Sequence, residues 1–350
     1  MSVDYRPLFT PVSREEVAQF KQVSRATGQP WAHAASAVTI LTVLVGVVAA
    51  VVVGGVFVTS LPIAFASFSS AGTAALAPFI IAPLLIVAIG GYATYQYFRQ
   101  TTGRWESLLR RTRFASANQL TYSTGVKNPA YPGLIFSHGD SRQTSDNYQS
   151  VAGPQFDLGN YRYTTGSGKE KKTHTWGYLA LRLERKLPHM VLDARGNNGI
   201  LGGSTLPTSF RRDQKLSLEG DFDKYFTLYC PREYERDALY VFTPDLMALL
   251  IDEGAAFDVE IVDDWMFVYS VQPFALDEAK TVHRLFSIIE TIGVKMLRQT
   301  DRYADERIGD STIDLVAPRG QRLKKGTTVA SIGIFVVFAW VAVSFARAWF

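Results

Sequence analysis

Long apolar runs dominate both ends of this chain. Residues 26–98 contain no Asp, Glu, Lys or Arg, whereas a domain surrounded by water needs charged residues on its surface. The runs 37–58 and 76–98 each have about the 20 apolar residues that a helix needs to cross a bilayer. A third run spans residues 327–346. The pattern predicts three transmembrane helices, the first two forming a hairpin within residues 34–98.

Basic residues predict how these helices are oriented. Arg6, Arg14, Lys21 and Arg25 precede the first run, and arginines crowd the stretch after the second. Because Lys and Arg gather on the cytoplasmic side of a membrane, the N-terminus and the central region are predicted to be cytoplasmic. The C-terminus is predicted to lie outside. A cleaved signal peptide is excluded, since the first run starts too late and is too long. The predicted location is the cell (inner or plasma) membrane, as a multi-pass protein.

The polar parts of the chain have helical and strand periodicities in separate blocks. In the N-terminal arm, residues 1–33, Ser13 and Glu16 form a capping-box pattern before a short amphipathic helix. That helix could lie on a membrane or stand free in solvent. Residues 99–126 are predicted as a helical connector, 127–310 as a cytoplasmic domain and 311–326 as a basic linker.

Within residues 127–310, strand patterns come first and the clearest helices last. Strands are predicted at 133–139, in two runs within 156–185, and at 189–194 and 225–230. Helices are predicted at 243–256, where Thr243 and Pro244 form the start signal, and at 276–303. Residues 257–270 are predicted as a hairpin that turns at Asp263 and Asp264. Segregated strands and helices predict an α+β domain with a mixed or antiparallel sheet.

Charge and cysteine content narrow the possible partners. Residues 114–318 contain 22 Lys and Arg but 28 Asp and Glu, so this region lacks the basic excess typical of nucleic-acid binding. The single cysteine excludes an intrachain disulfide. The predicted partners are membrane lipids and another membrane or membrane-associated protein, with no nucleic acid.

One stretch has the spacing of a catalytic loop. Cys230 and Arg236 have five residues between them, as in cysteine-dependent phosphatases, which makes them weak catalytic candidates. Against this, the loop has no glycine to turn amides toward a phosphate, and Pro231 removes a donor. Glu233 and Glu235 would repel the anion. The plainer interpretation is a strand end followed by a charged turn.

Metal and cofactor chemistry have little support in the pattern. The five histidines do not pair at ligand spacing, and one cysteine cannot build a common zinc site. The triplet that begins at His138 is too short to indicate a hydrolase. We therefore predict no metal and no cofactor.

The stretch from Leu179 to Arg307 resembles a family of uncharacterised bacterial integral membrane proteins, closest to actinobacterial members. The likeness rests on a "GDF-x-x-YF" strand that leads through a charged turn into a "TP-x-x-M" helix. The matching residues are Asp221, Phe222, Tyr225, Phe226, Thr243, Pro244 and Met247. The resemblance implies a structural motif within a cytoplasmic domain of unknown function, and it implies no catalytic residue.

These observations favour an interaction or scaffold module, or a subunit of a membrane complex. The alternative is a membrane-anchored hydrolase acting on phosphate-containing substrates, which would use either Cys230 or the loop that begins at His138. The sequence therefore favours a protein that is not an enzyme.

Overall fold

The computed structural model describes residues 3–29, 31, 46, 54–55, 58–59, 62, 103–198, 203–218, 220–310 and 312–326. The chain divides into two compact units. One consists of residues 1–9 and 114–350, and the other of residues 10–113.

The prediction of three transmembrane helices is contradicted. Nowhere in the described ranges is there a helix long and apolar enough to cross a bilayer. The continuous helical stretch at 279–300, for example, exposes Lys280, Arg284 and Glu290. The predicted spans 37–58, 76–98 and 327–346 lie, apart from residues 46, 54–55 and 58, outside the described residues. The multi-pass location rested on these three helices and is withdrawn with them.

Unit 10–113 confirms the predicted N-terminal helix. Helix α2 (Arg14–Ala26) starts with a capping box, in which the Ser13 hydroxyl accepts the Glu16 amide at 3.2 Å and the Glu16 carboxylate accepts the Ser13 amide at 2.7 Å. Trp105, only 2% exposed, meets the Phe20 ring edge-on at 6.1 Å. Glu16 also pairs with Arg113 at 2.6 Å. The helix is therefore packed within its own unit and does not stand free.

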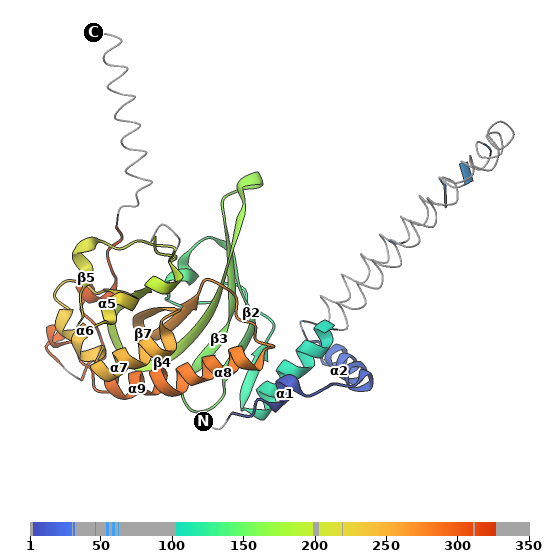
Figure 1. The fold of residues 1–350 in the computed structure, drawn as a ribbon, viewed down its shortest axis with the longest axis horizontal. Coiled ribbons are helices and arrows are strands. Elements are labelled where there is room, and N and C mark those ends of the chain that lie inside the picture. The colour runs from blue at the N-terminus through green and yellow to red at the C-terminus, as the bar shows by residue number, and fades with distance from the viewer. Residues whose placement is uncertain are drawn as a thin grey trace, which may run out of the picture. The chain divides into compact units, whose positions relative to one another are not determined.

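The larger unit contains an antiparallel sheet (Figure 1). Seven strands of the described residues form it. They are β1 (Leu120–Ser123), β2 (Asp140–Ser150), β3 (Phe156–Thr165), β4 (Lys172–Ala194), β5 (Lys215–Leu216), β6 (Phe226–Tyr229) and β7 (Asp258–Ser270). Strand β4 is the centre. It pairs with β3 along its first half and with β6 at its end, while β7 follows it from Gly177 to Leu192.

Strand β4 changes register twice against β7. Arg182 faces Trp265 but Leu187 faces Asp263, so β4 has three more residues than β7 in this interval. A further extra residue lies between Leu187 and Met190, where Pro188 is tolerated because a bulge needs no ladder amide. Such bulges redirect side chains, and His189 lies within this one.

Helices cover one face of the sheet (Figure 1). They are α6 (Glu235–Val241), α7 (Pro244–Leu249), η6 (Leu250–Gly254), α8 (Ala279–Ile288), η7 (Ile289–Gly293) and α9 (Val294–Thr300). Their buried residues, such as Val282, Phe286 and Met296, form one core with Leu179, Leu181 and other sheet residues. The shorter helical segments are α1 (Arg6–Phe9), η2 (Leu134–Ser137), η3 (Gly168–Glu170), η4 (Arg195–Asn197), η5 (Arg212–Gln214), α5 (Phe222–Tyr225), η8 (Glu306–Ile308) and α10 (Pro318–Gln321).

A second, aromatic core lies on the opposite face of the sheet. Phe136, Tyr178, Phe267 and Tyr269 are buried there, together with Leu323. Most of the cover comes from η2, the stretch 203–210 and the end of the described chain. Two cores on one sheet confirm the α+β prediction, with antiparallel pairing throughout the described strands.

Several local predictions were wrong. Asp263 and Asp264 do not turn a hairpin, because 258–270 is one strand with Asp263 at a positive φ of 53° within a bulged region. Residues 134–137 form η2 instead of a strand, and 189–194 is the end of β4. The connector is helical over 103–117 but ends in strand β1.

Candidate functional site

A groove of about 600 Å³ opens where three segments of the larger unit meet. One segment is η5 with the residue before it, the second is the turn after β6, and the third is the stretch that contains α10. The lining residues are Arg211, Asp213, Gln214, Pro231, Arg232, Glu233, Glu235, Arg319, Arg322 and Lys324. Five of these side chains are basic and three are acidic, so the groove has a basic excess of two.

The turn of the groove is the stretch that suggested a phosphatase loop. Cys230 directly follows β6, and its amide donates to the Gln214 carbonyl at 2.9 Å. The Tyr234 amide closes the turn on the Pro231 carbonyl at 3.1 Å. Glu233 takes a positive φ of 75°, a conformation that costs a non-glycine residue free energy. The turn therefore has a defined conformation, with its charged side chains directed to the surface.

Cys230 lacks the properties of a nucleophile. The side chain is 2% exposed. Burial, followed by the charges of Glu235 and Asp237, raises the thiol pKa to about 12, so the thiolate that attacks phosphorus is absent at neutral pH. Arg236 lines a separate pocket with Tyr240 and Arg302. The structure gives the hydrolase alternative no usable thiol.

The third segment of the groove, residues 316–326, is here called the closing segment. Asp305, which is 2% exposed, accepts the Ala317 amide at 2.9 Å and the Tyr234 hydroxyl at 2.7 Å. Gly320 lies against the Tyr234 ring so closely that no side chain would fit. Residues 311–326 were predicted as a linker, but 316–326 are fixed to the domain by buried contacts.

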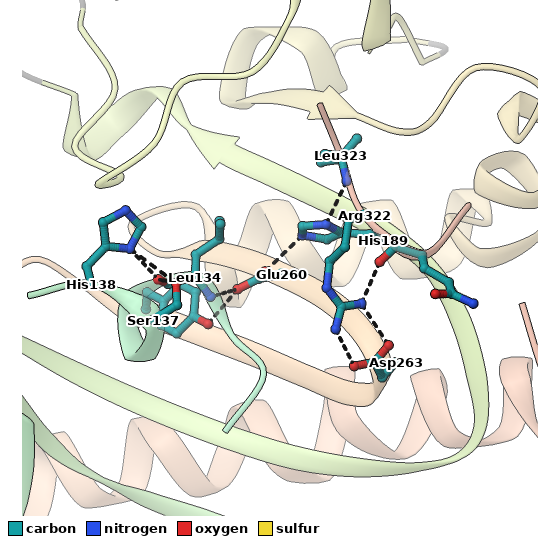
Figure 2. A network of polar contacts seen from close by, with 10 residues as sticks. Leu134, Ser137, His138, His189, Glu260, Asp263, Arg322 and Leu323 are labelled. Carbon is teal, nitrogen blue, oxygen red and sulfur yellow. Dashed lines mark hydrogen bonds and ion pairs between the residues drawn. The ribbon is translucent and has the colours of Figure 1, made fainter. Parts of the chain in front are cut away.

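The other end of the closing segment is bound by a buried histidine (Figure 2). The Leu323 amide donates to Nδ1 of His189 at 3.0 Å, which leaves Nε2 as the protonated nitrogen. Nε2 donates to Glu260 at 2.9 Å, and the other oxygen of Glu260 accepts the Tyr269 hydroxyl at 2.6 Å. Glu260 also accepts the Leu134 amide at 2.7 Å. In this network the side-chain polar atoms of His189, Glu260 and Tyr269 all have hydrogen-bond partners, as a buried polar network requires.

Ion pairs hold most basic side chains of the groove in place. Two guanidinium nitrogens of Arg211 donate to the Asp213 carboxylate, at 2.9 and 3.1 Å. Arg322 forms the same two-bond ion pair with Asp263, at 2.7 and 2.8 Å, as Figure 2 shows. Lys324 is exposed, and its amine has no carboxylate within ion-pair distance among the described residues. That amine is therefore available to an anionic ligand.

The family-motif residues have structural positions. Phe222 and Phe226 are buried and stack at 5.0 Å. Tyr225 is 40% exposed, and Asp221 forms a surface pair with Lys224 at 2.7 Å. Thr243 and Pro244 begin α7, and Met247 packs against the core. None of these side chains lines the groove.

The triplet at His138 is a turn and no metal site. His138 Nδ1 contacts the Leu134 carbonyl at 2.8 Å, and Gly139 provides the positive φ of 65° before β2. In the part of the chain that the structure describes, no group of three or more His, Cys, Asp or Glu is placed to hold a metal ion.

The sequence interpretation missed the buried acids on the aromatic face of the sheet. Asp157, Asp193, Asp258 and Glu260 are each at most 6% exposed. A signal was present, since Asp258 and Glu260 alternate with Val259 and Ile261 in the run 257–262, whose other residues are apolar. Two-residue periodicity puts such acids on one face, and that face is buried here.

Comparisons with known proteins add little. No protein-family model and no curated protein matches the sequence. Among solved structures, the chain is similar to the mycobacterial trehalose monomycolate transport factor A, TtfA, at 12% identity. The alignment covers 52% of this chain and 93% of that protein, with a TM-score of 0.32. A likeness this weak carries no argument about fold or function, and the resemblance to a bacterial membrane family stays a prediction.

Proposed function

We propose that the larger unit is a protein-interaction module whose partner presents an acidic segment to the groove. The observation that supports this most is the basic excess of the groove within a unit that is otherwise acidic. Lys324 provides a cation without an acidic partner among the described residues, and Arg232 is held only by a 3.9 Å contact to Asp213. An acidic segment would find two available positive groups there.

Binding suits this groove better than catalysis does. A hydrolase needs an activated nucleophile or a bound metal, and Cys230 provides neither the access nor the ionisation. The basic side chains of the groove can instead bind carboxylates without any group being activated. The interaction role therefore requires only the charges that line the groove.

The anchored closing segment would favour such binding. Hydrogen bonds from the amides of Ala317, Leu323 and Lys324 fix the backbone on this side of the groove. The Lys324 amide donates to the Gln214 side chain at 2.8 Å. A surface that is ordered before the partner arrives loses less conformational entropy on binding. The charges of the groove would chiefly raise the rate of association with the acidic segment. Salt would screen this attraction and slow the association.

The test uses a fluorescein-labelled octaglutamate peptide and the full chain, followed by fluorescence anisotropy at low and high salt. A double charge reversal, Arg232→Glu with Lys324→Glu, is expected to weaken binding by about tenfold or more, since each tenfold is about 1.4 kcal/mol. The matched control is Lys169→Glu with Lys280→Glu, which changes the net charge equally at exposed sites outside the groove.

The control variant should bind as the wild type does. Equal weakening by both variants would indicate a general charge effect and contradict a groove-specific site. Absence of binding by the wild type at low salt would also remove the proposal.

A further inference from the structure

Glu233 has an unusual backbone conformation in the turn that lines the groove. The turn runs from Pro231 to Tyr234, whose amide donates to the Pro231 carbonyl at 3.1 Å, so Glu233 is its third residue. At this position Glu233 has a φ of 75°. A positive φ at the third residue of a turn is normally taken by glycine or asparagine, which tolerate it best. The sequence therefore breaks a local rule at Glu233.

Contacts from elsewhere in the unit hold this conformation. The Arg307 guanidinium donates to the Glu233 carbonyl and lies over the Tyr234 ring, 3.8 Å from its centre. Arg307 is itself fixed by Asp305, at 3.0 Å. Strained backbone persists where surrounding contacts impose it, and it gathers at functional sites. The strain at Glu233 therefore indicates a role for its side chain that glycine could not fill.

The Glu233 carboxylate pairs with Arg319 of the closing segment, so the pair joins two of the three segments that line the groove. Nη1 of Arg319 donates to both carboxylate oxygens, at 3.1 and 3.3 Å. Arg211 and Arg322 each use two nitrogens for their ion pairs instead. The Arg319 and Glu233 side chains are also the more exposed, at 79% and 58%. Because exposed pairs of this kind are weak, another carboxylate can displace Glu233 from Arg319.

We propose that Glu233 is an internal competitor of the acidic partner, and that it occupies Arg319 until a carboxylate of the partner displaces it. The inference rests on the proposed function, because it describes the regulation of the same groove. Glu233 has the carboxylate that an acidic segment would present, and as part of the same chain it has a high effective concentration at Arg319.

The competitor would make the groove selective. A segment with a single acidic residue would gain little, since it must replace one carboxylate with another. A segment with several acidic residues would also reach Arg232 and Lys324, whose cations are the more available ones. Raising the cost of binding for weak ligands is a general way to obtain specificity.

The test compares Glu233→Gln with Glu235→Gln in the full chain, by anisotropy of the labelled octaglutamate peptide at low salt. Both glutamates are exposed and line the groove, so each variant removes one negative charge there. Glu235 forms no ion pair within the described part of the chain. Glu233→Gln should tighten binding by about two- to fivefold, as expected for the release of one exposed ion pair. Glu235→Gln should give a smaller gain, through the reduced negative charge alone.

A double-mutant cycle with Arg319→Gln locates the source of the gain. In the Arg319→Gln background no guanidinium is released, so Glu233→Gln should tighten binding no more than Glu235→Gln does. Thermal unfolding adds a separate readout. Glu233→Gly should keep or raise Tm, since glycine relieves the strain of a positive φ. A fall in Tm would assign the Glu233 side chain to the stability of the turn and contradict the proposal.

The outcomes separate this inference from the proposed function. If the wild type binds the peptide but Glu233→Gln binds no more tightly than Glu235→Gln, the competitor is overturned and the groove remains a binding site. A full gain that persists in the Arg319→Gln background also overturns the competitor. Absence of binding by the wild type and by both glutamate variants removes the proposed function, and the competitor with it.

Discussion

Nδ1 of His189 accepts the amide hydrogen of Leu323 at 3.0 Å, across a separation of 134 residues in the chain. The bond requires a neutral imidazole protonated on Nε2, and Glu260 accepts that proton. A bulge in β4 directs His189 toward both partners. One side chain thereby connects the sheet to the closing segment.

The His189→Ala variant should be destabilised by about 2–4 kcal/mol, because it leaves the buried Glu260 carboxylate without its side-chain donor on β4. Urea unfolding measures the loss, and amide hydrogen exchange at Leu323 should become faster than in the wild type. His174→Ala is the control, since His174 is partly exposed, stacks on Tyr163 and contacts the Thr165 hydroxyl. A loss below about 1 kcal/mol for His189→Ala would contradict the network's importance.

Cys230 should resist alkylation in the folded protein. Its thiol pKa is raised to about 12, so iodoacetamide at pH 8 should label it only after denaturation. Mass spectrometry of native and guanidinium-treated samples gives the two rates. Fast labelling of the native chain would reopen the phosphatase hypothesis. The Cys230→Ala variant removes the thiol without adding a polar group. Its free energy of unfolding should lie within about 2 kcal/mol of the wild-type value.

Gly320→Ala should loosen the closing segment. An added Cβ would collide with the Tyr234 ring and Val316, and such overpacking costs about 1–3 kcal/mol. Gly203→Ala is the matched change, because nothing lies within 4 Å of the added atom there. Differential scanning fluorimetry compares the two. Equal melting temperatures would mean that the closing segment moves aside at little cost.

Asp258 should make stability depend on pH in a defined direction. Its folded pKa is about 7, above the ordinary value of 3.8, so between these values the folded state binds more protons than the unfolded state. The Asp258 contribution to the unfolding free energy therefore falls as pH rises from about 4 to 7, by up to about 4 kcal/mol at about 1.4 per unit. Asp258→Asn should flatten this part of the profile. A profile that is unchanged by the substitution would show that Asp258 does not titrate in this range.

The α+β class, the capping box at Ser13 and the helix after Thr243 could be predicted from sequence, because each depends on residues close together in the chain. The course of β7 could not. Two adjacent aspartates, 263 and 264, usually indicate a turn, but they pair with Arg322 and Arg182, and β7 continues through them at a bulge. Contacts of this kind join distant segments and leave no local pattern.

The groove was hidden for a related reason. Cys230 and Arg236 attracted attention through their spacing, whereas the lining comes from three segments that only the fold brings together. The basic residues at 319, 322 and 324 looked like a membrane-flanking linker. The Leu323 amide donates to His189 and the Lys324 amide to Gln214, and these bonds place the stretch on the domain instead. Charge counts alone could not distinguish these interpretations.

Strand β4 has 23 residues and contacts β3, β6 and β7. A fragment cut within this strand would leave unpaired edges on both pieces, so neither half of the larger unit should assemble alone. Early synthesis products that end before residue 258 would also lack the neighbour that runs beside β4. The sheet of a nascent chain can then close only after residue 270 of 350 has been synthesised, and chaperones would find exposed β4 edges until then.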